Sequence, residues 1–293
     1  MTSRTGIDAQ VITGMRILVT GGTGKTGSRV ATSLRAGGHV PVIASRGGQP
    51  EIRFDWGDPA TYAEAARNVD AAYLVAPSGE FDLVPAMTPF IDALIGAGVG
   101  RLVLLSAASL PEGGPMMGAV HAYLADHAPR WTVLRPSWFM QNFSEQQHRR
   151  TIVAEGVIYS AAGDGRVGWI DADDIAAVAA NVLVDEAREN GDLVLTGPET
   201  LDHDAIASTI GMVSGRDVVH RRLTEARLAE RFAAAGLPPD YAATLAGMDA
   251  AIGEGEGDFV TTTVSDLTGR PATAFARFAD DNREAWRPCE RIN

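Results

Sequence analysis

A short glycine-rich segment, from Val19 to Gly27, constrains the fold of this chain more than any other part of its sequence. It follows the apolar run Ile17–Val19 and precedes Ser28–Leu34, in which apolar residues recur at helical spacing. A strand, a glycine-rich turn and a helix in this order direct backbone N–H groups and a helix N-terminus towards a phosphate. We therefore expect a nucleotide to bind at this turn.

Two nucleotide-binding motifs compete for the turn. A P-loop, G-x-x-x-x-G-K-[ST], requires a glycine five residues before Gly24, and Val19 stands there. A dinucleotide-binding turn needs spaced glycines for tight bending, for close approach to the diphosphate and for helix–strand packing. The glycines of this turn have that spacing, so the sequence favours a dinucleotide. The expected contacts come from Gly21, Thr23, Gly24, Lys25, Thr26 and Gly27.

Apolar segments and helical patterns alternate through the first two-thirds of the chain. Apolar segments with little polar alternation, separated by helices, indicate a parallel sheet that is buried on both faces. Right-handed crossovers then give an α/β fold with a Rossmann-like, doubly wound sheet and its ligand at the carboxyl ends of the strands. The predicted strands are 16–20, 40–44, 52–55, 72–76, 101–106 and 131–134, and the predicted helices are 26–36, 61–68, 83–97 and 120–127.

Beyond residue 195 the pattern becomes mostly helical. This change predicts three parts: a flexible extension over 1–14, a dinucleotide-binding domain over 15–195 and a smaller substrate-facing region over 196–293. An insertion at 138–164 is expected to contribute to the last part. Its predicted helices are 203–214, 225–235, 241–252 and 273–286, with one short strand near 218–222.

The residues after the second predicted strand indicate which dinucleotide binds. An NAD-preferring site usually places Asp or Glu here to hold the ribose 2′-hydroxyl, but the first acidic residue is Glu51. Arg46 instead offers a planar, always-charged group suited to a 2′-phosphate, with Ser45 as a second donor. NADP(H) is therefore the predicted cofactor.

The ends of the later strands complete the predicted cofactor site. Asp55 closes the third strand, where a carboxylate can meet the adenine amino group or cap the following turn. Ala76, Pro77 and Ser106, at the ends of the fourth and fifth strands, are expected to line the nicotinamide side of the cleft.

One lysine limits the proton chemistry. Many short-chain dehydrogenases use a Tyr-x-x-x-Lys pair, in which the lysine lowers the pKa of the tyrosine. Lys25 is the only lysine of this chain and lies in the glycine turn, which excludes that pair. His121 and Tyr123 remain the nearest candidates for a proton donor, while His127 is expected late on the same helix, facing solvent.

Composition excludes several other classes. The formal net charge of −12 argues against a nucleic-acid partner, which needs a basic face. No apolar run approaches the roughly 20 residues of a membrane span, and the first residues lack a secretory signal pattern. Cys289 is the only cysteine, and the scattered histidines have no ligand spacing, so we expect a cytoplasmic protein without a metal site. The paired carboxylates Asp173 and Asp174 are expected to cap a helix rather than to catalyse.

Several separate segments resemble the NmrA-like atypical short-chain dehydrogenases, and within them the ergot-alkaloid dehydrogenases of the agroclavine and festuclavine type. The resemblance implies an NADP(H)-binding Rossmann domain with a small substrate-facing C-terminal region. This family includes imine-type reductases, quinone reductases and sensor proteins that bind the dinucleotide without turnover. The absent Tyr–Lys pair agrees with the atypical group. The segments are Ile17–Gly27, Val40–Arg46, Leu102–Ser109, Leu134–Phe143, Asp173–Ala176, Leu195–Glu199 and Thr268–Pro271.

The leading hypothesis is an NADPH-dependent reductase of a C=N bond in a small molecule of secondary metabolism. An iminium carbon is already electrophilic, so its reduction needs orientation and exclusion of water more than a proton donor. Trp138 and Phe139 are expected to form an apolar wall for a cationic or aromatic substrate, with Gln141 and Asn142 as orienting hydrogen-bond donors. Reduction of quinones or activated carbonyls, and a redox-sensing regulator without turnover, are the alternatives; the sequence does not fix an oligomeric state.

Overall fold

The structure, a computed structural model, describes residues 14–47, 51–77, 79–80 and 82–287. Except for Gly14, the predicted N-terminal extension lies outside these residues, as does Cys289. Within the described residues, no helix is long and apolar enough to cross a membrane.

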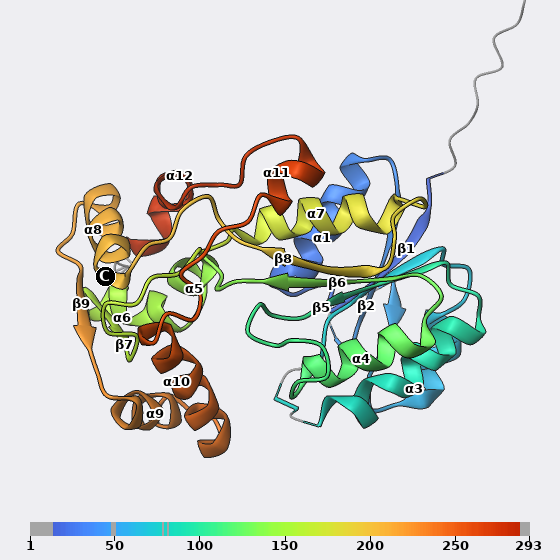
Figure 1. Cartoon of the computed structure of the whole chain (residues 1–293), viewed down its shortest axis with the longest axis horizontal. Coiled ribbons are helices and arrows are strands. Elements are labelled where there is room, and N and C mark those ends of the chain that lie inside the picture. Colours follow the sequence, from blue (N-terminus) through green and yellow to red (C-terminus); the bar gives the residue numbers. More distant parts are fainter. Residues whose placement is uncertain (1–13, 48–50, 78, 81, 288–293) are drawn as a thin grey trace, which may run out of the picture.

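A seven-stranded parallel sheet forms the centre of the molecule (Figure 1). Its strand order, β3-β2-β1-β4-β5-β6-β8, reverses direction at β1, which pairs with both β2 and β4. This is the predicted doubly wound, Rossmann-like α/β sheet. The strands are β1 Arg16–Thr20, β2 Val40–Ser45, β3 Ile52–Arg53, β4 Ala71–Leu74, β5 Arg101–Leu105, β6 Trp131–Pro136 and β8 Gly191–Leu195.

Helices cover both faces of the sheet, as Figure 1 shows. Along β1, Ile17 and Val19 belong to one core cluster and Leu18 to the other, because successive side chains of a strand point to opposite faces. Burial on both faces explains why the strands lack polar alternation. One face carries α1 Lys25–Ala36, α7 Ala172–Val184 and α11 Thr263–Thr268, and the other carries α2 Tyr62–Ala65, α3 Leu83–Gly96 and α4 Met117–His127.

A second group of elements lies beyond the carboxyl end of β6. Its apolar core includes Phe143, Trp169, Phe275 and Trp286, which come from the predicted insertion, the segment before α7 and the chain's end. A two-stranded parallel sheet joins β7 Val157–Ser160 to β9 Val219–Arg222. The helices are α5 Gln141–Ser144, α6 Gln147–Glu155, α8 His203–Ser214, α9 Glu225–Ala234, α10 Pro239–Gly253 and α12 Phe275–Asp281.

Some elements differ from the sequence prediction. Strand β8 was not predicted, because it contains Gly191 and Asp192, is only partly buried and pairs with β6 alone. Helix α2 is shorter than predicted, and the long final helix is divided into α12 and a 3-10 turn at Arg283–Trp286.

The N-terminus of α7 corrects the predicted cap. Asp171 is the N-cap residue, and its carboxylate accepts a hydrogen bond from the Asp173 backbone N–H at 3.0 Å. Asp173 instead pairs with Arg29, at 3.1 Å between Oδ1 and Nε. Asp174 is fully buried, pairs with Arg270 at 2.6 Å and accepts a hydrogen bond from Thr273 N at 2.7 Å. Both carboxylates are structural, as predicted, but they tie other segments to α7 rather than cap it.

Three buried histidines lie together in the second group of elements, the one beyond the carboxyl end of β6. The ring of His203 stacks on that of His220 at 5.1 Å and lies 6.0 Å from that of His148. Among the described residues, neither ring nitrogen of His203 has a hydrogen-bond partner. Burial, with a smaller contribution from His220, lowers the pKa of His148 to about 4. Burial also lowers the pKa of His203 well below its ordinary value, so the core holds neutral imidazoles.

The contribution of His148 to stability should therefore fall in mild acid. Below pH 6.5 the unfolded chain protonates His148 and the folded chain does not, so the free energy of unfolding falls as pH drops. This shift corresponds to about 2 kcal/mol between pH 7 and pH 5. Asp249 acts in the opposite direction, because burial raises its pKa to about 6.

Urea unfolding of a single-site variant separates these contributions. His148→Leu should lose about 2 kcal/mol less than the wild type between pH 7 and pH 5. The matched change His127→Leu, at an exposed histidine, should leave the wild-type loss unchanged. An equal loss in the wild type and in His148→Leu would contradict the assignment.

Candidate active site

A cavity of about 870 Å³ opens at the carboxyl ends of β1, β2, β4, β5 and β6, on the side closed by the C-terminal elements. This is where ligands bind in doubly wound sheets. Most residues predicted for the cofactor and the substrate line it: Gly21, Thr23, Gly24, Lys25, Thr26, Ser45, Arg46, Asp55, Ala76, Pro77, Ser106, Trp138, Phe139 and Asn142.

The glycine turn brings the first turn of α1 to the cavity. Gly21 has a φ of +60°, a left-handed conformation that favours glycine, and its carbonyl accepts a hydrogen bond from Gly24 N at 2.8 Å. Gly27 does not line the cavity; a β-carbon there would lie 2.3 Å from the Gly21 carbonyl oxygen. Gly27 therefore serves helix–strand packing, the role of the last glycine in a dinucleotide turn.

The start of α1 suits an anion. Its N-cap residue is Gly24, and its first turn contains no acidic side chain, so neither capping nor repulsion blocks the helix N-terminus. Lys25 adds a positive side chain to the same wall. These features fit the diphosphate of a dinucleotide.

The end of β2 presents cationic and polar groups. The exposed guanidinium of Arg46 lines the cavity and has no acidic partner among the residues that the structure describes. The Ser45 hydroxyl donates to the Gly47 carbonyl at 2.7 Å. On the neighbouring segment after β3, Asp55 accepts a hydrogen bond from Gly57 N at 3.0 Å, which is the turn-capping alternative, and it lines the cavity as well.

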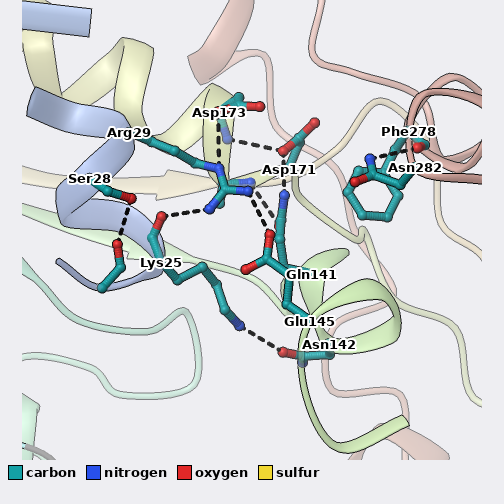
Figure 2. A network of polar contacts seen from close by, with 12 residues as sticks. Lys25, Ser28, Arg29, Gln141, Asn142, Glu145, Asp171, Asp173, Phe278 and Asn282 are labelled. Carbon is teal, nitrogen blue, oxygen red and sulfur yellow. Dashed lines mark hydrogen bonds and ion pairs between the residues drawn. The ribbon is translucent and has the colours of Figure 1, made fainter. Parts of the chain in front are cut away.

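Lys25 reaches from the glycine turn to the opposite wall, as Figure 2 shows. Its ammonium donates to Asn142 Oδ1 at 3.4 Å and lies 5.1 Å from the centre of the Phe139 ring. Burial lowers the pKa of Lys25 to about 8, while Glu145 raises it and Arg29 lowers it to smaller extents. The lysine therefore carries a charge that titrates just above neutrality.

Arg29 fixes the two walls of the cavity relative to each other (Figure 2). It pairs with Glu145 at 2.6 Å beyond α5 and with Asp173 on α7, and it donates to the Lys25 carbonyl at 2.8 Å. One guanidinium thus joins the start of α1 to both later segments.

Gln141 is not a wall residue, which corrects the prediction that it orients a substrate. Its side chain is buried beneath the N-terminus of α7, where Nε2 donates to Asp171 Oδ1 at 2.7 Å. Its Oε1 accepts from Ala172 N at 3.0 Å. Both ends of the amide are thus engaged in supporting the α7 cap.

His121 and Tyr123 also lie away from the cavity wall. His121 is 1% exposed and packs on Trp131 at 5.4 Å, and burial lowers its pKa. The Tyr123 hydroxyl donates to Asp92 Oδ1 at 2.7 Å, and its ring stacks on His127 at 4.0 Å. We therefore propose no catalytic role for either residue.

The C-terminal part supplies wall residues that sequence reasoning missed. Met248, Glu256 and Phe259 line the cavity from α10 and the loop after it. No local motif marks them, because their place follows from how this loop packs onto the sheet. Gly168 N donates to the Gly257 carbonyl at 3.1 Å, and Thr261 N donates to Thr196 Oγ1 at 2.8 Å. Within the described part of the chain, no group of three or more His, Cys, Asp or Glu side chains is arranged so that it could hold a metal ion.

Comparison with known proteins agrees with this geometry. Residues 21–186 match the family model described as NAD(P)H-binding. The chain is 41% identical to the uncharacterized oxidoreductase YesF of Bacillus subtilis (strain 168), over 92% of this chain and 96% of that protein. It is also 41% identical to agroclavine dehydrogenase of Claviceps fusiformis, over 93% and 99% of the two chains.

Solved structures show the same architecture. The NADPH complex of the NADPH-dependent quinone oxidoreductase QOR2 from Escherichia coli superposes with a TM-score of 0.78 at 27% identity, covering 91% of this chain and 99% of that one. The glycine turn, the doubly wound sheet and these relatives agree. The chain therefore belongs to the NAD(P)H-binding, NmrA-like atypical short-chain dehydrogenases and is an NAD(P)-dependent oxidoreductase.

Proposed function

We propose that the protein uses NADPH to reduce a C=N bond, in the form of an iminium ion, in a small cationic or aromatic molecule. The observation that carries the proposal is that both predicted proton donors, His121 and Tyr123, lie off the cavity wall. Addition of hydride to an iminium carbon moves the C=N π electrons onto nitrogen and gives a neutral amine, so no proton is required in that step. The agroclavine and festuclavine dehydrogenases among the relatives support this choice.

Different residues along the cavity are proposed to bind different parts of the cofactor. With the cofactor bound, the N–H groups of the glycine turn would hold the diphosphate, Arg46 would hold the 2′-phosphate with Ser45 beside it, and Asp55 would face the adenine. Ala76, Pro77 and Ser106 line the nicotinamide side. When bound, the reduced nicotinamide is the source of hydride.

The substrate wall orients the second reactant. Trp138 and Phe139 are both half-buried and offer aromatic surface to a flat molecule, on which a cation gains roughly 0.5–2 kcal/mol. Asn142, held by Lys25, faces the same cavity and can orient a polar group. These side chains also exclude water from the reacting atoms.

Quinone reduction is the second candidate. It is favoured by the similarity to a quinone oxidoreductase and by the hydroxyls of Ser106, Ser109 and Ser137, which line the cavity and can donate hydrogen bonds to a carbonyl. A quinone gains negative charge on oxygen when it is reduced, so it needs such donors more than an iminium does.

The two candidates are separated by steady-state oxidation of NADPH. We expect kcat/KM for N-methyl-3,4-dihydroisoquinolinium to exceed that for menadione by at least about tenfold, which corresponds to about 1.4 kcal/mol of transition-state binding. A faster reaction with menadione would instead support the quinone reductase.

The proposed 2′-phosphate contact predicts a change in cofactor preference. Arg46→Ala should weaken NADPH binding about tenfold, the value of one charge-assisted contact, and leave NADH binding nearly unchanged. Calorimetry with both cofactors measures this. The control is Arg53→Ala, which removes an exposed arginine that pairs with Asp58 and does not line the cavity. If Arg46→Ala weakens both cofactors equally, the contact is not to the 2′-phosphate.

The low pKa of Lys25 predicts pH-dependent cofactor binding. The free enzyme holds Lys25 protonated below pH 8 and loses this charge above it, so the Kd for NADPH should rise up to about tenfold from pH 7 to pH 9. Lys25→Arg, which stays charged, should keep Kd flat over this range. Lys25→Met should bind weakly at both pH values, and a rise that persists in it would assign the titration to another group.

A further inference from the structure

The C-terminal loop places one acidic residue on the cavity wall whose side chain has no partner among the described residues. Glu256 lines the cavity, and its side chain makes no hydrogen bond or ion pair with any residue that the structure describes. Its neighbour Asp258 pairs with Arg166 at 3.8 Å, and Glu254 does not line the cavity. Among the acidic side chains of this loop, Glu256 alone is therefore available to a ligand.

The backbone on both sides of Glu256 is held in place, and the side chain itself is exposed. Gly255 and Gly257, on either side, have φ values of +97° and +106°, which a residue with a side chain rarely adopts. Glu256 N donates to the Ala251 carbonyl at 3.2 Å, at the end of α10, and the Gly257 carbonyl accepts from Gly168 N. The loop is thus attached on both sides of Glu256, to its own helix and to the segment before α7.

The charged side chains at the two ends of the cavity differ in sign. Lys25 and Arg46 lie on the segments that follow β1 and β2, where the phosphates are proposed to bind. The other acidic wall residue, Asp55, already accepts a hydrogen bond from its own turn. Glu256 shares the C-terminal wall with Met248 and Phe259, whose side chains are apolar and polarizable. A free carboxylate beside such groups suits an organic cation with a flat apolar body.

We propose that Glu256 is the specificity-determining residue that recognises the positive charge of the substrate. The inference rests on the proposed iminium reduction and identifies its substrate class as a permanently or readily cationic, mostly apolar amine derivative. Attraction to a carboxylate lowers the free energy of the bound cation, whereas a neutral quinone gains nothing from it.

Charge recognition by Glu256 predicts a specific change in the kinetic parameters. The iminium loses its positive charge as hydride arrives, so Glu256 stabilises the bound substrate more than the transition state. Removing the charge should therefore raise KM for the cation without lowering kcat. A group that merely supports the fold would lower kcat, or would affect charged and neutral substrates alike.

The test compares Glu256→Gln with the matched variant Glu254→Gln, two residues away on the same loop. For N-methyl-3,4-dihydroisoquinolinium, Glu256→Gln should raise KM about fivefold at 0.05 M salt, and the increase should shrink at 0.5 M salt because the attraction is screened. KM for menadione and the Kd for NADPH should stay unchanged, as should all values in Glu254→Gln. Equal KM increases for both substrates, or no increase for the cation, would overturn the proposal.

A binding experiment separates this proposal from the proposed reaction. N,N-dimethyl-tetrahydroisoquinolinium carries the same charge and cannot accept hydride, so calorimetry with the NADP+-loaded protein measures recognition without turnover. Its Kd should rise about fivefold in Glu256→Gln. If no iminium is reduced but this shift is found, the reaction is wrong and charge recognition stands. If the wild type does not bind the cation, or binds it no better than Glu256→Gln, charge recognition is wrong.

Discussion

The close approach of Gly21, which precedes α1, and Gly27, in the first turn of α1, is the contact on which the site depends. Any side chain at Gly27 would meet the Gly21 carbonyl oxygen, and one at Gly22 would lie 2.7 Å from the Ile43 side chain on β2. Only residues without a side chain at these positions allow α1 to begin this close to the sheet. Because α1 packs on α7 in the same core cluster, this contact also sets the helix layer over that face. The position of the first turn of α1, and with it this end of the cavity, follows from the contact.

Charge then links this first turn to the substrate side. Exposed ion pairs add little to stability, but Arg29 is only 24% exposed and is shared between Glu145 and Asp173. Its main consequence is geometric: it ties the start of α1, where the diphosphate is proposed to bind, to the segment that carries Asn142. Lys25 joins the same two segments. It lies in the glycine turn, and its partner Asn142 stands 117 residues later in the sequence. The cofactor and substrate walls are therefore one connected unit (Figure 2).

The sequence predicted the elements whose signals are local. The apolar run of β1 and the helix His203–Ser214, with Asp202 as its N-cap, have the predicted bounds because the pattern and the caps lie within the elements themselves. Strand β8 escaped prediction because its pairing partner is β6, far back in the chain, and its own residues are partly exposed. Gln141 is a second case in which local sequence was not enough, here for a predicted site residue. Its sequence position beside an aromatic cluster suited a substrate contact, yet the packing of α7 turns its amide inward.

By itself the sequence determined the fold class, the dinucleotide turn and the NADP(H)-type cofactor, because glycine spacing and the alternation of strands and helices are local features of the chain. The tertiary structure decided which side chains close the opposite end of the cavity. Glu256, Met248 and Phe259 lie far from the glycine turn in sequence, and folding alone brings them to the same wall. It also placed His121 and Tyr123 away from the cavity wall, because burial and hydrogen bonding direct a side chain only once its neighbours are in place.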